Sequence, residues 1–414
     1  MSTPDRDPSR ALTRRQFVRA AGASGALALT PSAHGSSGKD DSTAPAGKGP
    51  KTKLPTRVLG KTGLKVSTIC YGSYNLSNPR LLDEALSKGM TLVVTANDYQ
   101  NGTAERAIGE VMKRRRKQVV LGTGKGCKTQ TTTDELLREI DRSLERLQTD
   151  HVDLWRVHHV NDARVLKNEA IYESFDKAKQ AGKVGHLGLS THTSPATGKV
   201  VEAAIASKRF EFLMSKYNFM EFPENYVPFA KAAKAGMGVI VFKVDAGRRE
   251  KAVQEMTRLQ KELKVSAGQA KIKWALNNKH VTSVVSGERS FEGIREACQA
   301  VSTPLSRAER RYLDAYAERF KHEYCRYCGT CAGACPHGVQ VDDVMRFAMY
   351  FKYYGAEKAA MQEYAALPSA KQAAHCAGCS GDCMAACPNG VRIQPQLAEA
   401  HELLTLGAGT DHYA

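Results

Sequence analysis

The chain has 414 residues, with 60 Lys and Arg against 43 Asp and Glu and a formal net charge of +17. This length suits two or three domains around a large core. The basic residues are not arranged as an Arg/Lys array interleaved with aromatic residues, which argues against nucleic acid as a partner. No segment has the length and apolarity needed to span a bilayer, so we expect no stable membrane span.

The first 53 residues read as an export signal followed by a linker. Thr13–Arg19 contains the pair Arg14-Arg15 and resembles the twin-arginine motif, and the weakly apolar run that follows, Ala20–Thr30, is too short to cross a membrane. Residues 32–53 are rich in Gly, Ser, Pro and Lys, which is typical of a linker, with cleavage expected near Ala46 or Ala33. We therefore expect a periplasmic or otherwise exported protein that folds and loads its cofactors before export.

Residues 54–303 alternate short apolar, β-branched runs with amphipathic helical runs. Alternation of this kind predicts a parallel sheet with buried strands, and eight strands over about 250 residues predict a (β/α)8 barrel. An open doubly wound sheet is the alternative, but no Gly-x-Gly-x-x-Gly links a first strand to a helix. The candidate strands are Val66–Tyr71, Leu92–Ala96, Gln118–Thr123, Val152–His158, Val184–Ser190, Phe212–Tyr217, Gly238–Lys243 and Thr282–Ser286.

Four segments of this region carry a family resemblance. Arg57–Ser67 looks like an opening hairpin, and Gly89–Tyr99, Asp153–His158 and Gly182–Ser190 look like the second, fourth and fifth strands of an aldo/keto reductase. The resemblance implies a barrel that interconverts a small carbonyl compound and an alcohol with NADP(H) as the candidate cofactor.

Carbonyl reduction needs a proton donor, and a free tyrosine, with a pKa of about 10, is too weak without a nearby cation and hydrogen-bond donor. The family uses Tyr, Lys, His and Asp at the C-terminal ends of successive strands. By the resemblance, Tyr99 is the acid, Lys125 lowers its pKa and His158 orients the carbonyl. The position of the family's aspartate holds Val94, so the cation loses its carboxylate partner and we expect any nicotinamide-dependent carbonyl reduction to be weak.

The resemblance also indicates the cofactor-binding residues. Ser190 corresponds to the serine that helps to hold the nicotinamide amide, and Phe242 to the aromatic residue that stacks on the nicotinamide. Arg289 is the clearest cation in the phosphate-binding loop after the last strand. The strand-six glutamine of the family aligns with Met214, another departure from its pattern.

Two runs of cysteines occupy the C-terminal region. The first follows the C-x2-C-x2-C-x3-C-P pattern of bacterial ferredoxins, and the second has one extra residue between its second and third cysteines. The fourth cysteine of each run ligates the other cluster in two-cluster ferredoxins, so we expect two 4Fe–4S clusters with exchanged fourth ligands. Zinc and disulfides are the alternatives. The two predicted ligand sets are Cys325, Cys328, Cys331 and Cys387, and Cys376, Cys379, Cys383 and Cys335.

Residues 304–414 have a helical pattern, with helices expected at 306–321, 341–354 and 357–367, and form a helical ferredoxin-type domain in this interpretation. Signal, barrel and cysteine tail together resemble a bacterial subfamily of aldo/keto reductases. The sequence thus predicts an iron–sulfur oxidoreductase whose clusters connect the barrel to a redox partner protein. A non-catalytic electron-transfer subunit with a degenerate barrel is the alternative.

Overall fold

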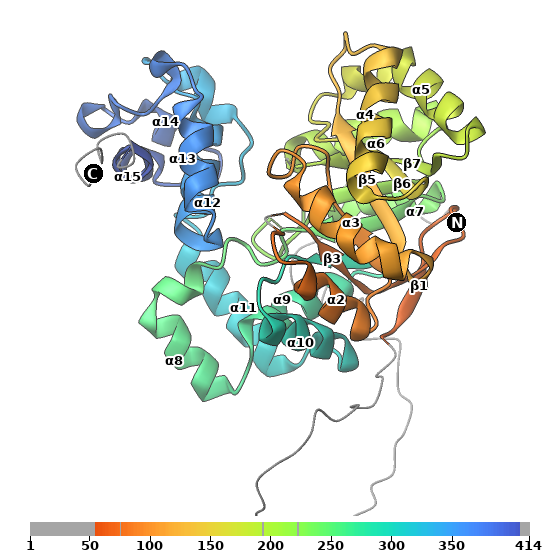
Figure 1. Ribbon diagram of the computed structural model, residues 1–414. Helices are drawn as coiled ribbons and strands as arrows, with labels where there is room; N and C mark the ends of the chain where they lie inside the picture. The colour runs from red at the N-terminus through yellow and green to blue at the C-terminus, as the bar shows by residue number, and fades with distance from the viewer. Residues whose placement is uncertain (1–53, 75, 193, 222, 406–414) are drawn as a thin grey trace, which may run out of the picture.

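A computed structural model describes residues 54–405, with the exception of residues 75, 193 and 222 (Figure 1). The expected export signal and linker, residues 1–53, lie outside the described residues, so they stay predictions. Among the residues that the structure describes, no helix is long and apolar enough to cross a membrane.

An antiparallel hairpin, β1 (Thr56–Val58) and β2 (Lys65–Ser67), precedes a closed parallel barrel. The barrel confirms the predicted (β/α)8 fold and excludes the open doubly wound sheet. Its strands are paired in the order β10-β3-β4-β5-β6-β7-β8-β9, so that the last strand closes on the first. The barrel strands are β3 (Ile69–Gly72), β4 (Leu92–Val94), β5 (Val120–Gly126), β6 (Val152–His158), β7 (Val184–Thr191), β8 (Phe212–Lys216), β9 (Gly238–Phe242) and β10 (Ser283–Ser286).

Helices lie outside the barrel and cover its strands (Figure 1). Local sequence explains several of their ends: Thr132 and Glu135 form a capping box at the start of α4, and the side chain of Asn78 caps α2, whose first residue is Pro79. The helices are α2 (Pro79–Ser87), α3 (Thr103–Arg115), α4 (Thr133–Leu147), α5 (Glu169–Gln180), α6 (Ser194–Ser207), α7 (Tyr226–Lys234), α8 (Gln254–Leu263), α9 (Ala267–Leu276) and α10 (Phe291–Gln299).

The predicted strand Val66–Tyr71 is divided between the hairpin and the barrel. The backbone N–H of Thr68 donates to the carbonyl of Pro55, and the hydroxyl of Ser67 donates to the carbonyl of Ile69. These bonds turn the chain from β2 into β3, and an apolar run alone does not reveal such a turn.

The tail beyond the barrel has a core of its own. Helices α12 (Val341–Tyr354), α13 (Glu357–Ala365) and α15 (Ile393–Thr405) pack with both cysteine runs, and α14 (Asp382–Ala385) lies within the second run. Helix α11 (Arg307–Phe320), by contrast, packs with the barrel, where Glu309 forms a buried ion pair of 2.7 Å with Lys273 of α9. The two cores divide between Tyr324 and Cys325, later than the boundary expected at residue 303.

The tail is held against the barrel by buried polar contacts. Lys216, at the end of β8, donates to the backbone carbonyl of Arg326 at 3.0 Å and lies 4.8 Å from the ring centre of Tyr327. The same ammonium pairs with Glu221 at 2.8 Å, and both side chains are at most 2% exposed. These contacts place the first cysteine run close to the C-terminal end of the barrel.

Candidate functional site

A cavity of about 460 Å³ opens at the C-terminal ends of the barrel strands, where active sites of such barrels lie. Its walls come from the loops after the strands and from α12 and α13 of the tail. Of the residues singled out in the sequence, it brings together Tyr99, His158, Ser190, Phe242 and Arg289.

Tyr99 lies in the loop after β4, and its ring packs edge to face against two other rings of the cavity. The ring centres of Tyr74 and His158 are 5.3 and 5.7 Å away. Burial raises the pKa of Tyr99 to about 12, and the positive charge of Arg156 opposes this effect. The phenol is therefore protonated at neutral pH and needs help to release its proton.

His158 ends β6 and is 6% exposed. Its Nδ1 accepts a hydrogen bond from Nε of Arg156 at 3.3 Å and lies 3.0 Å from the hydroxyl of Ser190. Burial holds the pKa of His158 well below its usual value, and the charge of Arg156 adds to this effect. Because Nδ1 accepts and the ring is neutral, the proton lies on Nε2, which is then a hydrogen-bond donor.

The hydroxyl of Ser190 is occupied within the protein. It accepts a hydrogen bond from the backbone N–H of His159 at 2.9 Å and lies within hydrogen-bond distance of Nδ1 of His158, at 3.0 Å. The structure therefore links Ser190 to the orientation of His158, while its expected contact with the nicotinamide amide stays a prediction.

Lys125 does not join Tyr99 and His158. Side chains alternate along a strand, and Thr123 of β5 points outward, where its hydroxyl donates to Glu105 of α3. Lys125 follows Thr123 by two residues, so its side chain also points outward. It lines a separate depression outside the barrel with Glu135 and Glu139. The expectation that it lies beside Tyr99 is wrong for this geometric reason.

The cation beside Tyr99 is Arg156 of β6, a residue that the sequence reasoning missed. It is 2% exposed and lines the same cavity as Tyr99 and His158. The signal was present in the sequence, because Arg156 precedes His158 by two residues on a buried strand and so shares its inward face. Val94, in the place of the family's aspartate, lies in the cavity wall as expected.

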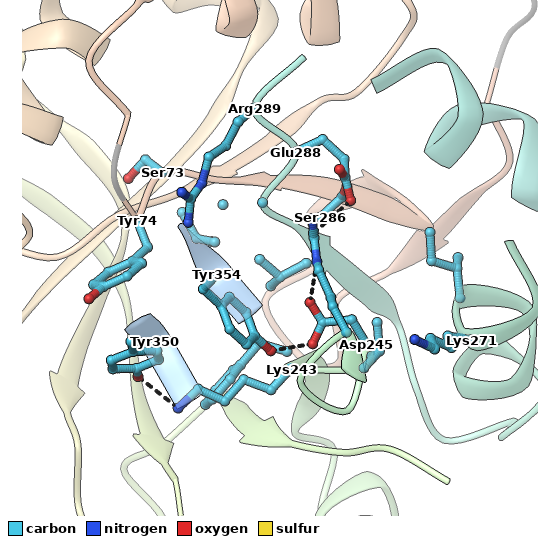
Figure 2. A pocket seen from close by; sticks show the side chains of 18 of the residues that line it. Ser73, Tyr74, Lys243, Asp245, Lys271, Ser286, Glu288, Arg289, Tyr350 and Tyr354 are labelled. Atoms are coloured by element: carbon cyan, nitrogen blue, oxygen red, sulfur yellow. Dashed lines mark hydrogen bonds and ion pairs between the residues drawn. The ribbon is translucent and has the colours of Figure 1, made fainter. Parts of the chain in front are cut away.

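The rest of the cavity lies between the barrel and α12. The ring centre of Phe242 is 4.7 Å from that of His192, and Nη1 of Arg289 donates to the carbonyl of Gly355 at 2.9 Å. Tyr350 of α12 packs beside Tyr74, and Figure 2 shows the hydroxyl of Tyr350 directed to Lys243 and that of Tyr354 to Asp245. The tail thus contributes directly to the wall of the barrel's cavity.

Two strand ends in the cavity adopt left-handed backbone conformations. His159, after β6, has φ 63°, and Lys243, after β9, has φ 55°. Conformations of this kind are costly for residues other than glycine and cluster at functional sites. His159 and His192 both line the cavity with His158, and the ring centres of His159 and His192 are 4.2 Å apart.

All eleven cysteines lie in the described residues and are free, which argues against disulfides. Among the residues that the structure describes, no group of three or more His, Cys, Asp or Glu side chains is positioned to hold a metal ion. The two runs nevertheless lie side by side: the rings of His337 and His375 stack 4.9 Å apart.

The thiols of the two cysteine runs affect one another's pKa. Burial raises the pKa of Cys331 to about 12, with further contributions from Cys328 of its own run and from Cys387 and Cys383 of the other. Burial raises the pKa of Cys376 to about 11, and here Cys335 of the first run is the largest thiol contribution. The fourth cysteine of each run therefore lies near the other run.

Comparisons with known proteins agree with this geometry. Residues 69–318 match the family model described as the aldo/keto reductase family. An uncharacterized oxidoreductase of Bacillus subtilis, YrpG, is 29% identical over 308 residues, which cover 62% of this chain and 94% of that protein. The 6-dehydroglucose reductase of Novosphingobium aromaticivorans is 31% identical over 159 residues, which cover 33% of this chain and 51% of that protein.

Among solved structures, the holo form of the aldo-keto reductase AKR11C1 from Bacillus halodurans aligns with a TM-score of 0.54 and 23% identity. The alignment covers 63% of this chain and 96% of that one. It supports the barrel fold. The family match ends at residue 318, before the first cysteine run.

Proposed function

This chain belongs to the aldo/keto reductase family, and on that premise we propose an iron–sulfur oxidoreductase whose barrel interconverts a small carbonyl compound and an alcohol with NADP(H). The observation that carries this proposal is the convergence of Tyr99, His158 and Arg156 in one cavity at the C-terminal end of the barrel. In this cavity Tyr99 and His158 are hydrogen-bond donors and Arg156 is a cation, and such groups can stabilise the alkoxide that develops on the carbonyl oxygen.

The protein's own groups would act on the carbonyl oxygen. Tyr99 donates the proton that the new alcohol needs, and neutral His158 donates a hydrogen bond from Nε2 that orients and polarises the carbonyl. Arg156 and Ser190 hold Nδ1 of His158 as an acceptor, which keeps the proton on Nε2. In the reverse direction the phenolate of Tyr99 removes the proton of the alcohol.

Bound NADP(H) would supply or accept the hydride. Phe242 offers an aromatic face for the nicotinamide, and Arg289 and Arg248 are the cations near the loop after β10. Arg248 is already paired with Asp245 and Glu288, and Arg289 with Gly355 of the tail. A cofactor there would lie beneath α12, so we propose that it binds before export and exchanges slowly.

A direct experiment uses the anaerobically purified full-length protein. NADPH is titrated while protein fluorescence and melting temperature are followed, and NADPH consumption is then measured with 4-nitrobenzaldehyde as a probe carbonyl. The proposal requires saturable binding and consumption that depends on the aldehyde. If millimolar NADPH changes neither the fluorescence nor the melting temperature of the protein, the proposed use of nicotinamide is refuted.

We also propose that the tail, residues 325–405, holds two 4Fe–4S clusters and passes single electrons to a redox partner protein. The support is the donor set: eight free, half-buried or buried thiols in two runs that interact across runs. Cys325, Cys328, Cys331 and Cys387 would hold one cluster, and Cys376, Cys379, Cys383 and Cys335 the other. Buried clusters at these positions would supply one-electron storage next to the barrel.

Export through the twin-arginine route completes the proposal. Its support is the Arg14-Arg15 pair and the short apolar run that follows. The route suits a protein that must acquire its clusters and a slowly exchanging cofactor before it leaves the cytoplasm.

A further inference from the structure

Arg156 is a buried cation without a carboxylate partner within hydrogen-bond distance among the described residues. Its Nε donates to Nδ1 of His158 at 3.3 Å, its guanidinium also hydrogen-bonds the side chain of Tyr99, and its Nη1 has no partner. Taking a cation out of water costs several kcal/mol unless other groups compensate for it. Burial accordingly lowers the pKa of Arg156, while Tyr99 and the charges of Asp98 and Glu105 act in the opposite direction.

The neighbouring strand is built to accommodate this side chain. Gly124 of β5 lies opposite Arg156 in the sheet register, on the inward face that Lys125 does not share. A Cβ atom at Gly124 would lie 2.5 Å from Cγ of Arg156 and 2.3 Å from its backbone carbonyl oxygen. The backbone of β6 and the side chain of Arg156 together leave no room for a side chain, and so for a lysine, at this inward position of β5.

We infer that Arg156, from β6, takes over the task that the family assigns to a lysine on the preceding strand: it positions Tyr99 and stabilises its phenolate. The inference rests on the proposed role of Tyr99 as the proton donor. Arg156 acts through Tyr99 and His158 and is a positioning residue.

The replacement also explains Val94. A buried lysine keeps its proton only with a carboxylate nearby, whereas an arginine stays charged at any physiological pH. Once arginine supplies the charge, an aspartate at position 94 is no longer needed to hold it. Val94 is 4% exposed and packs with the apolar interior of the barrel, including Leu154 and Met214. The two departures from the family pattern are therefore one coupled change.

The test compares Arg156→Met and Arg156→Lys with the wild type as full-length, cluster-loaded protein. Methionine fills similar volume without charge, a replacement that buried ion sites often tolerate. Arg249→Met is the matched control, because Arg249 is also buried, at 4% exposure, but lies over Tyr324 and Tyr353 outside the cavity. Folding of each variant is checked by its melting temperature.

The first readout is the titration of Tyr99 itself, followed by NMR with tyrosine labelled at Cζ and assigned with Tyr99→Phe. We expect Arg156→Met to shift this titration to higher pH, Arg156→Lys to restore part of the shift, and Arg249→Met to leave it unchanged. An unchanged titration in folded Arg156→Met would overturn the inference.

The second readout is NADPH-dependent reduction of 4-nitrobenzaldehyde. Arg156→Met should lower kcat about 100-fold, in the range of acid–base effects, with little change in KM for NADPH. If the wild type shows no turnover but the titration still shifts, the proposed function fails while the placement of Arg156 beside Tyr99 holds. If turnover is normal in Arg156→Met, the inference fails and the proposed function stands.

Discussion

Tyr99 is the residue on which the proposed chemistry depends. Tyr99→Phe keeps the ring and its contacts with Tyr74 and His158 but removes the proton donor. We expect NADPH-dependent reduction of the probe aldehyde to fall by about 10²–10⁴-fold, while NADPH binding is retained. Tyr172→Phe is the control, since Tyr172 is buried away from the cavity and donates to the carbonyl of Leu166. Equal losses in both variants would remove Tyr99 from the mechanism.

His158 gives a prediction about pH. Its pKa is lowered by burial, and by the charges of Arg156, His159 and Lys243, so the folded protein keeps it neutral. The unfolded chain binds a proton near pH 6.5, and stability therefore falls as the pH drops below that value, by up to about 1.4 kcal/mol per pH unit. Urea unfolding between pH 7.5 and 5 should show this slope, and His158→Gln should flatten it. Identical slopes in the two proteins would contradict the burial of a neutral histidine.

The family resemblance predicted part of this site. Tyr99, His158, Phe242 and Arg289 could be aligned with strand ends, and the structure brings them into one cavity. Lys125 was misplaced, because an alignment of residue types does not fix which face of a strand a side chain occupies. A shift of one residue along the strand moves a side chain from the inside of the barrel to the outside.

At the scale of elements, β5 shows what the sequence could and could not specify. Its existence follows from an apolar run, but its end is Gly122-Thr-Gly-Lys-Gly126, where the alternation of small and polar residues gives no apolar signal. The structure extends β5 to Gly126, beyond the predicted end at Thr123. At Gly124 an added Cβ would meet the backbone oxygen and Cγ of Arg156 on the next strand at 2.3 and 2.5 Å.

Helix α12 is the element that connects tail and cavity, a contact that no local sequence pattern predicts. The hydroxyl of Tyr354 bonds to Asp245, which also pairs with Arg248 at 2.9 Å. Tyr354→Phe removes one of these links, and a hydrogen bond to a charged group contributes about 1.5–3 kcal/mol. We expect NADPH to dissociate roughly 10-fold faster or more, as measured by stopped-flow fluorescence.

The neighbouring Tyr353 supplies the control for this prediction, because it lies over Arg249 and does not line the cavity. Tyr353→Phe should leave NADPH dissociation unchanged. If Tyr354→Phe has no effect either, α12 does not retain the cofactor.

At the scale of the whole molecule, the proposed exchange of fourth cysteine ligands makes a prediction that separates the two proposed clusters. Anaerobic protein should contain about eight iron and eight acid-labile sulfide per chain, as two 4Fe–4S clusters require. Cys335→Ser should disturb the cluster of the second run, and Cys387→Ser that of the first, which electron paramagnetic resonance of the reduced protein can distinguish. Stoichiometric zinc in place of iron would contradict the cluster proposal.

The proposed export also concerns the whole chain. Replacing both Arg14 and Arg15 with lysine should leave the protein in the cytoplasm, as cell fractionation would reveal. A lysine pair preserves the charge of the segment, so the change tests the arginines themselves. Unaltered delivery to the periplasm would count against the twin-arginine route.

The central claim is that hydride transfer to a carbonyl takes place in the cavity between barrel and tail. It is tested most directly with NADPH carrying deuterium at nicotinamide C4, incubated anaerobically with the full-length protein and 4-nitrobenzaldehyde. The account predicts that one face of C4 delivers deuterium to the carbonyl carbon of the alcohol formed, and that Tyr99→Phe slows this transfer. Alcohol without deuterium from either face, or no alcohol at all from protein with bound NADPH, would contradict it.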